Sequence, residues 1–236
     1  MGLFSRKKTS QEEMLFQKEN RARLEEFVVT KAWGVKKYAT ANQFIYDAEH
    51  KWFVVCEGPE ESFREKNPYI IAFDQVTDVS LEIDEYWSEK KDEFAPRGFG
   101  RILQEDYSKV YWRYDFYLTI STTHPYAKEI RFQMNFKPTI AKVPNEKAIF
   151  YRRGFEIGGT YNAKELPALI ERMDKLVVDE AKRQHGEKVF DIVTNQRPDT
   201  ILGKLAADGM DTVYLKKIDN MTAHIKRADR IAKLLL

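Results

Sequence analysis

This chain of 236 residues has only one cysteine, Cys56. One cysteine forms no internal disulfide and no zinc site built from several thiolates. Cys56 ends the apolar run WFVVC, which favours a buried strand residue over a catalytic thiolate, because a reactive thiolate needs a positive and accessible setting. A reducing, cytoplasmic compartment is the simplest expectation.

Long hydrophobic runs are also missing, since no stretch approaches the roughly 18 apolar residues of a membrane-spanning helix. Basic and acidic residues nearly cancel, at 39 and 37, for a net charge of +2. Such a balance gives no overall attraction to nucleic acid. The glycine loop of nucleotide-binding proteins, the nucleophile elbow and the paired histidines of zinc proteases are absent. We therefore expect no catalytic residue, no cofactor and no metal ligand.

What the sequence does contain is a strong alternation of apolar and polar residues between Val110 and Lys137. A period of two predicts two antiparallel strands, each with one buried face, joined by a short loop. The expected buried residues are Val110, Trp112, Tyr114, Phe116, Leu118 and Ile120, followed by Ile130, Phe132, Met134 and Phe136. The opposite face of the first strand carries Tyr111, Arg113, Asp115 and Tyr117, which we expect to form a surface for another macromolecule.

Other patterns predict elements on both sides of this hairpin. A helix is expected from Ser10 to about Glu26, and a second helix, with an apolar stripe, over 163–184. The remaining expectations are a hairpin over 42–56, a short strand in YIIAF, a strand over 79–83, a charged loop from 84 to 100, a strand over 148–157, and a helix from 211 to the C-terminus.

The last helix has an apolar seam at alternating spacings of four and three, typical of a heptad repeat. The seam residues are Tyr214, Ile218, Met221, Ile225, Ala228, Ala232 and Leu235. The seam can pack on the protein's own body, or it can bind a partner helix or a second copy. Basic residues lie away from it, so the helix could also lie on an anionic membrane together with the N-terminal MGLFSRKK.

The histidines suggest little chemistry. We expect His50, His124 and His185 to be polar surface residues, and His224 to face solvent beside the seam. An enzyme alternative remains open, with a site assembled from dispersed groups such as Arg113, Asp115, His124 and Glu129. Base stacking on the aromatic residues is disfavoured, because single-strand binders also need a basic groove.

The order of the elements, several antiparallel strands followed by the helix at 163–184, resembles the pleckstrin-homology-like barrel. The phrase YIIAFDQVTDVSLEID resembles the strand-turn-strand of small bacterial domains of that type, which are largely uncharacterised. The resemblance covers roughly residues 40–185 and implies a binding module more than an enzyme. The first hairpin, FIYDAEHKWF, offers only Lys51, so it lacks the basic cluster of the phosphoinositide-binding members.

These observations together predict an α+β fold, with an antiparallel sheet or a partly open barrel of the pleckstrin-homology type capped by a helix. The expected parts are an N-terminal helical extension over 1–38, the sheet domain over 39–185 and a C-terminal helical region over 186–236. The expected function is non-enzymatic: a cytoplasmic scaffold that binds a protein partner through the sheet and docks or self-associates through the last helix. Peripheral membrane association is the alternative.

Overall fold

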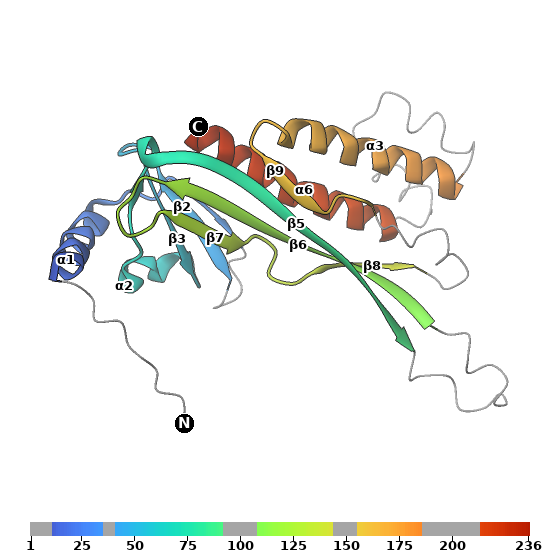
Figure 1. Ribbon diagram of the computed structural model, residues 1–236, viewed down its shortest axis with the longest axis horizontal. Helices are drawn as coiled ribbons and strands as arrows, with labels where there is room; N and C mark the ends of the chain where they lie inside the picture. The colour runs from blue at the N-terminus through green and yellow to red at the C-terminus, as the bar shows by residue number, and fades with distance from the viewer. Residues whose placement is uncertain (1–10, 35–40, 92–107, 144–154, 186–212) are drawn as a thin grey trace. The chain divides into compact units, whose positions relative to one another are not determined.

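The computed structural model describes residues 11–34, 41–91, 108–143, 155–185 and 213–236. They form two antiparallel sheets, with helices at both ends of the chain (Figure 1). Neither sheet closes into a barrel, because each strand order has two free ends. The α+β class and the antiparallel sheet predicted from the sequence are confirmed.

The first sheet has the strand order β1-β2-β3-β4. Its strands are β1 (Lys31–Gly34), β2 (Asn42–Asp47), β3 (Trp52–Glu57) and β4 (Ile71–Ala72). The predicted hairpin over 42–56 is confirmed as β2 and β3. Asp47 shapes its turn, since Oδ1 accepts from the backbone N–H groups of Glu49 and His50 at 2.9 and 3.1 Å, as turn-forming aspartates do.

Helix α1 (Gln11–Glu26) confirms the first predicted helix. Its apolar face is incomplete, and the buried Asn20 supplies a polar attachment in its place. Asn20 Nδ2 donates to Asn67 Oδ1 at 3.0 Å and to the Pro68 carbonyl at 2.8 Å, while its Oδ1 accepts from the Ile70 backbone N–H at 2.9 Å. Both polar atoms of the Asn20 side chain are thereby paired, as burial demands.

Two short helical elements follow β3: η1 (Glu60–Ser62) and α2 (Phe63–Lys66). Arg64 of α2 donates to the carbonyl of Leu24, in the last turn of α1, at 3.0 Å and to that of Phe27, just after the helix, at 2.7 Å. A cation at a helix C-terminus satisfies carbonyls that have no partner within the helix. The segment between β3 and β4 therefore contains helical turns that hold α1 in place.

The second sheet has the order β7-β6-β5-β9, with β8 also pairing with β6. It follows the 3₁₀ turn η2 (Phe73–Gln75). Its strands are β5 (Val76–Lys91), β6 (Ser108–Thr122), β7 (Glu129–Gln133), β8 (Thr139–Val143) and β9 (Gly159–Asn162). The predicted hairpin of Val110–Lys137 is confirmed as β6 and β7, although β7 ends at Gln133 instead of Lys137.

Two expectations in this sheet need correction, one of a loop and one of part of a strand. The charged loop predicted from residue 84 is strand as far as Lys91. Hydrogen bonding to the long neighbour β6 can hold charged residues in a strand that their own propensity does not favour. The strand predicted over 148–157 falls partly on 144–154, outside the described residues. Residues 155–158 are not strand, and β9 begins at Gly159.

The two long helices are α3 (Leu166–His185) and α6 (Val213–Leu235), close to their predicted positions. Before α3, Asn162 and Glu165 form the expected capping pair: Asn162 Oδ1 accepts from the Lys164 N–H at 3.0 Å, and Glu165 Oε2 accepts from the Asn162 N–H at 2.8 Å. Lys226 of α6 and Asp174 of α3 form an ion pair at 3.1 Å, so the helices are neighbours (Figure 1).

The chain forms two compact units whose boundaries fall inside β5, β6, β7 and α6. One unit comprises Met1–Val79, Thr119–Phe132 and Leu235–Leu236, and the other comprises Ser80–Leu118 and Gln133–Leu234. This grouping differs from the predicted parts 1–38, 39–185 and 186–236, which follow the sequence. Within the described ranges, no helix combines the length and apolar content needed to cross a bilayer.

Candidate functional site

The two faces of β6 differ in what covers them. Phe116 is fully buried, and its ring lies 5.1 Å from the ring of His224 on α6, so this face packs against the helix. Arg113 and Tyr117 point the other way and are half-buried, and the neighbouring strand β5 adds Asp84 and Tyr86, both exposed. We call Asp84, Tyr86, Arg113, Asp115 and Tyr117 the open face.

Asp115 connects the side chains of the open face. It is only 7% exposed, and its carboxylate accepts from Tyr86 Oη at 3.2 Å, from Gln133 Nε2 at 2.8 Å and from Asn135 Nδ2 at 3.3 Å. The sequence predicted an exposed Asp115, and that expectation is wrong. A buried polar group needs hydrogen-bond partners, and these three bonds connect Asp115 to residues on both sides of β6.

Asn135 lies in the interval between β7 and β8, which both pair with β6. Its Oδ1 accepts from the Phe116 backbone N–H at 2.9 Å, and its Nδ2 donates to the Tyr114 carbonyl at 3.0 Å. The side-chain amide thus takes the place of a strand's backbone at the point where β7 has ended and β8 has not begun. This substitution leaves β6 continuous through the interval, since buried backbone groups need partners.

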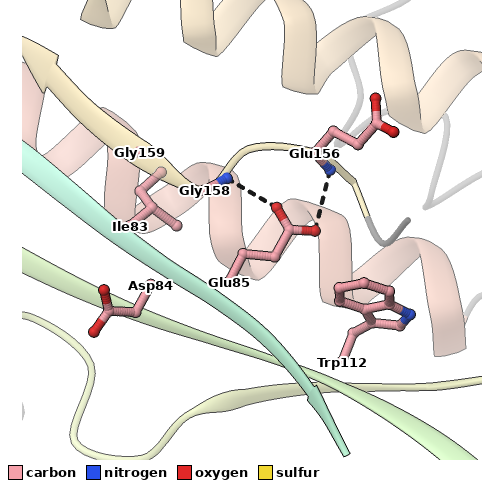
Figure 2. Close-up of a pocket in the computed structure, with 7 residues that line it drawn as sticks. All are labelled: Ile83, Asp84, Glu85, Trp112, Glu156, Gly158 and Gly159. Atoms are coloured by element: carbon pink, nitrogen blue, oxygen red, sulfur yellow. Dashed lines mark hydrogen bonds between the residues drawn. The ribbon is translucent and has the colours of Figure 1, made fainter. Parts of the chain in front are cut away.

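Glu85 lies on the covered side of β5, opposite in direction to Asp84 (Figure 2). Its carboxylate accepts from four successive backbone N–H groups, those of Phe155, Glu156, Ile157 and Gly158, at 3.0, 3.1, 2.6 and 2.8 Å. Successive backbone N–H groups that converge in this way form an anion-binding nest. We call residues 155–158 the nest.

Three other features stabilise this arrangement. Tyr114 Oη donates to Glu85 Oε1 at 3.1 Å. Arg172 of α3 donates to the carbonyls of Phe155 and Glu156 at 3.1 and 2.9 Å. It thus binds carbonyl groups of the same turn whose N–H groups bind Glu85. Glu156 has a left-handed backbone, with φ of 53°, a conformation in which successive N–H groups can converge. The nest therefore binds an anion that the chain itself supplies.

A shallow pocket of about 530 Å³ opens beside the nest. Glu85, Glu156 and Trp112 line it, together with Gly158 and Gly159 (Figure 2). Because its donors hold Glu85 in place, this carboxylate is committed to the turn instead of to a bound substrate. None of the four residues of the enzyme alternative, Arg113, Asp115, His124 and Glu129, lines this pocket. No group of three or more metal-ligating side chains lies together among the described residues.

The predicted seam of the last helix is covered by the chain itself. Ile218, Met221 and Ile225 have no exposed surface. The side chains of Tyr214 on this seam and of Tyr111 on β6 lie outside the described residues. A partner helix needs an accessible seam, so we do not propose self-association through these positions. Insertion of the same face into a membrane would require α6 to leave its sheet.

Two histidines differ from expectation. His124, predicted at the surface, is 1% exposed and packs against Phe16 and Tyr69, at ring separations of 5.1 and 5.3 Å. Burial lowers its pKa. His224, predicted to face solvent, packs on Phe116 with its Nδ1 buried and unpartnered. Sequence spacing missed both, because neither lies within a clear apolar period.

Cys56 fits the expected structural role. The thiol is buried, and burial raises its pKa to about 11. A thiol with such a pKa holds little thiolate near neutral pH, and the thiolate is the nucleophile. The described part of the chain therefore offers no activated cysteine.

Comparison with known proteins gives no relative: the chain matches no family model, no curated protein and no solved structure. The resemblance to pleckstrin-homology-like proteins stays a prediction. Function has to be argued from the site, since a fold alone does not determine it.

Proposed function

We propose that this chain is a non-enzymatic interaction protein of the cytoplasm, which binds a protein partner through the open face. The observation that supports this proposal is the hydrogen-bond network of Asp115, which orders Tyr86, Gln133 and Asn135 in the absence of a partner. Side chains ordered beforehand lose less entropy on binding. The network thus prepares a surface without contributing a reactive group.

The residue types on the open face also support partner binding. Tyrosine and arginine are enriched at the energetic centres of protein interfaces. Tyr86 is 40% exposed, and Arg113 and Tyr117 are half-buried. Arg113 Nε is buried and meets no acceptor among the described residues, and a guanidinium in general binds partners that supply carboxylate or carbonyl groups. Asp84 adds a negative charge at the edge of the same face.

The proposal is tested by capture with the full-length protein and two substitutions, Arg113→Ala and Tyr86→Phe. Arg113→Ala removes an interface side chain, and Tyr86→Phe removes only the hydroxyl that Asp115 holds. Glu171→Ala, on the exposed surface of α3, is the matched control. A partner retained by the wild type and the control is then purified, and its affinity is measured by calorimetry.

We expect Arg113→Ala to weaken the purified complex by about tenfold or more, as truncation of an interface arginine does. Tyr86→Phe should weaken it less, because the ring remains but is no longer fixed. The melting temperature of each variant should stay near that of the wild type. Equal affinity of Arg113→Ala and wild type for every captured partner would refute binding through the open face.

A further inference from the structure

Helix α6 carries three basic side chains on one side at intervals of three residues: His224, Arg227 and Arg230. Residues three apart on a helix are neighbours, with Cβ atoms about 5–6 Å apart. His224 lies at the edge of the covered face, Arg227 is half-buried, and Arg230 is exposed. The three side chains therefore lead from the covered face of the helix out to solvent.

This basic cluster has no hydrogen-bond or ion-pair partner among the described residues. No hydrogen bond or ion pair involves the guanidinium of Arg227 or Arg230 anywhere in the described structure, and His224 Nδ1 is buried without a partner. Other cations of α6 are paired: Lys226 with Asp174 at 3.1 Å and Lys233 with Asp229 at 2.7 Å. Among the described residues, the two arginines of the cluster therefore differ from these paired lysines.

An unpaired arrangement of this kind is unfavourable. Removal of a guanidinium from water without a counter-charge costs free energy. Burial, and then the nearby charge of Arg230, lower the pKa of Arg227, while burial, and then the charge of Arg227, lower the pKa of His224 to about 4. An anion placed among the three groups would offset both effects.

The surface beside the cluster leaves room for such an anion. Ala223 and Asn220 are exposed one and two turns before Arg227 on the same side of α6. Ala223 has a single carbon as its side chain, so it leaves space between the longer arginines. Asn220 adds an amide donor at the edge. The nearest acidic residue in sequence, Asp229, is buried and bonded to Lys233.

We propose that His224, Arg227 and Arg230 bind an oxyanion of the phosphate type. The guanidinium fork matches phosphate oxygens in pairs, and His224 Nδ1 supplies a further donor in its neutral tautomer. This binding site is separate from the open face and does not depend on the proposed partner. The phosphate group can belong to a free small molecule or to a lipid headgroup, and the experiment below distinguishes these sources.

Inorganic phosphate is the first probe, titrated into the full-length protein at constant ionic strength and followed by NMR of the histidine side chains. We expect the His224 signals to shift saturably. Arg227→Gln should weaken the affinity about tenfold or more, because charge-assisted bonds to a phosphate are lost. Lys216→Gln is the control, because Lys216 is an exposed, unpaired lysine of the same helix and the charge change is the same.

The thermal stability of the variants separates ligand binding from a structural role. Without phosphate, Arg227→Gln should melt at the same temperature as the wild type or higher, since it removes an unpaired, half-buried charge. With phosphate, only the wild type and Lys216→Gln should gain stability. A phosphate response that is unchanged in Arg227→Gln, or absent from the wild type, overturns the proposal.

Vesicles then identify the source of the phosphate group. Neutral phosphatidylcholine vesicles are compared with vesicles containing phosphatidic acid. Flotation of the wild type with the acidic vesicles, lost in Arg227→Gln and retained in Lys216→Gln, assigns the site to a lipid headgroup. A saturable response to inorganic phosphate without flotation assigns it to a free phosphorylated molecule. Flotation that falls equally in both variants reflects overall charge and contradicts a specific site.

Discussion

Glu85 provides the sharpest test of how the second unit is held together. Glu85→Gln keeps the size of the side chain but replaces one carboxylate oxygen with an amide group. In the native chain, Oε1 accepts from the N–H groups of Phe155 and Glu156, and Oε2 accepts from those of Ile157 and Gly158. Whichever way the new amide turns, two backbone donors of the nest face another donor.

The cost follows from these bonds. A buried donor left without an acceptor costs about 1–3 kcal/mol, and bonds that lose the charge of the acceptor become weaker. Because Glu85 is only half-buried, water can reach part of the nest and reduce the loss. We therefore expect Glu85→Gln to lower the free energy of unfolding by about 2–4 kcal/mol.

Urea unfolding of the full-length protein, followed by tryptophan fluorescence, measures this loss, and Asp84→Asn is the control. Asp84 is the adjacent residue, exposed, and its carboxylate makes no hydrogen bond with any described residue, so its substitution removes the same charge and no contact of the nest. We expect Asp84→Asn to change stability by less than about 0.5 kcal/mol. If Glu85→Gln costs no more than Asp84→Asn, the carboxylate does not hold the nest and the reasoning is wrong.

Two further predictions concern the same unit. In phosphate-free buffer, acidification should destabilise the protein. Histidine in the unfolded chain binds a proton below pH 6.5, whereas His224 in the folded protein does so only near pH 4. Between these two pH values the unfolded state binds more protons than the folded state, so the free energy of unfolding falls as the pH falls. At about 1.4 kcal/mol per pKa unit, the loss from pH 7 to 5 is about 2 kcal/mol. It should largely disappear from the urea titrations of His224→Gln, and an unchanged pH dependence would contradict the assignment. Asn135→Ala should cost about 2–4 kcal/mol, since it removes the hydrogen bonds of the amide with the Phe116 N–H and the Tyr114 carbonyl. A loss below about 1 kcal/mol in the same assay would show that backbone or water takes over the role of the amide.

Local pattern was enough to predict the elements whose burial is periodic. The alternation around Phe116 predicted β6 and its buried face, and the stripe through Leu169 and Met173 predicted α3. The extension of β5 to Lys91 could not be read in this way. Pairing with a neighbouring strand decides that segment, and its charged residues carry no local strand signal.

The candidate site shows the same division between local and tertiary information. Alternation placed Arg113, Asp115 and Tyr117 on one face, and the structure agrees. The burial of Asp115 was not predictable, because it depends on Tyr86, Gln133 and Asn135, which belong to other segments. The nest was missed for a similar reason, since nothing near residue 85 in sequence indicates the turn at 155–158.

The last helix shows how an amphipathic pattern can be read correctly and still mislead about function. The seam through Ile218, Met221 and Ile225 is buried, as an apolar seam should be, but the chain itself covers it. The polar side of α6 is the more informative one, because a heptad pattern predicts only solvated residues there. Paired cations such as Lys226 need no further explanation. Arg227 does need one, because it is partly desolvated and has no hydrogen-bond or ion-pair partner among the described residues. A neutral side chain at this position would avoid the cost of removing a charge from water.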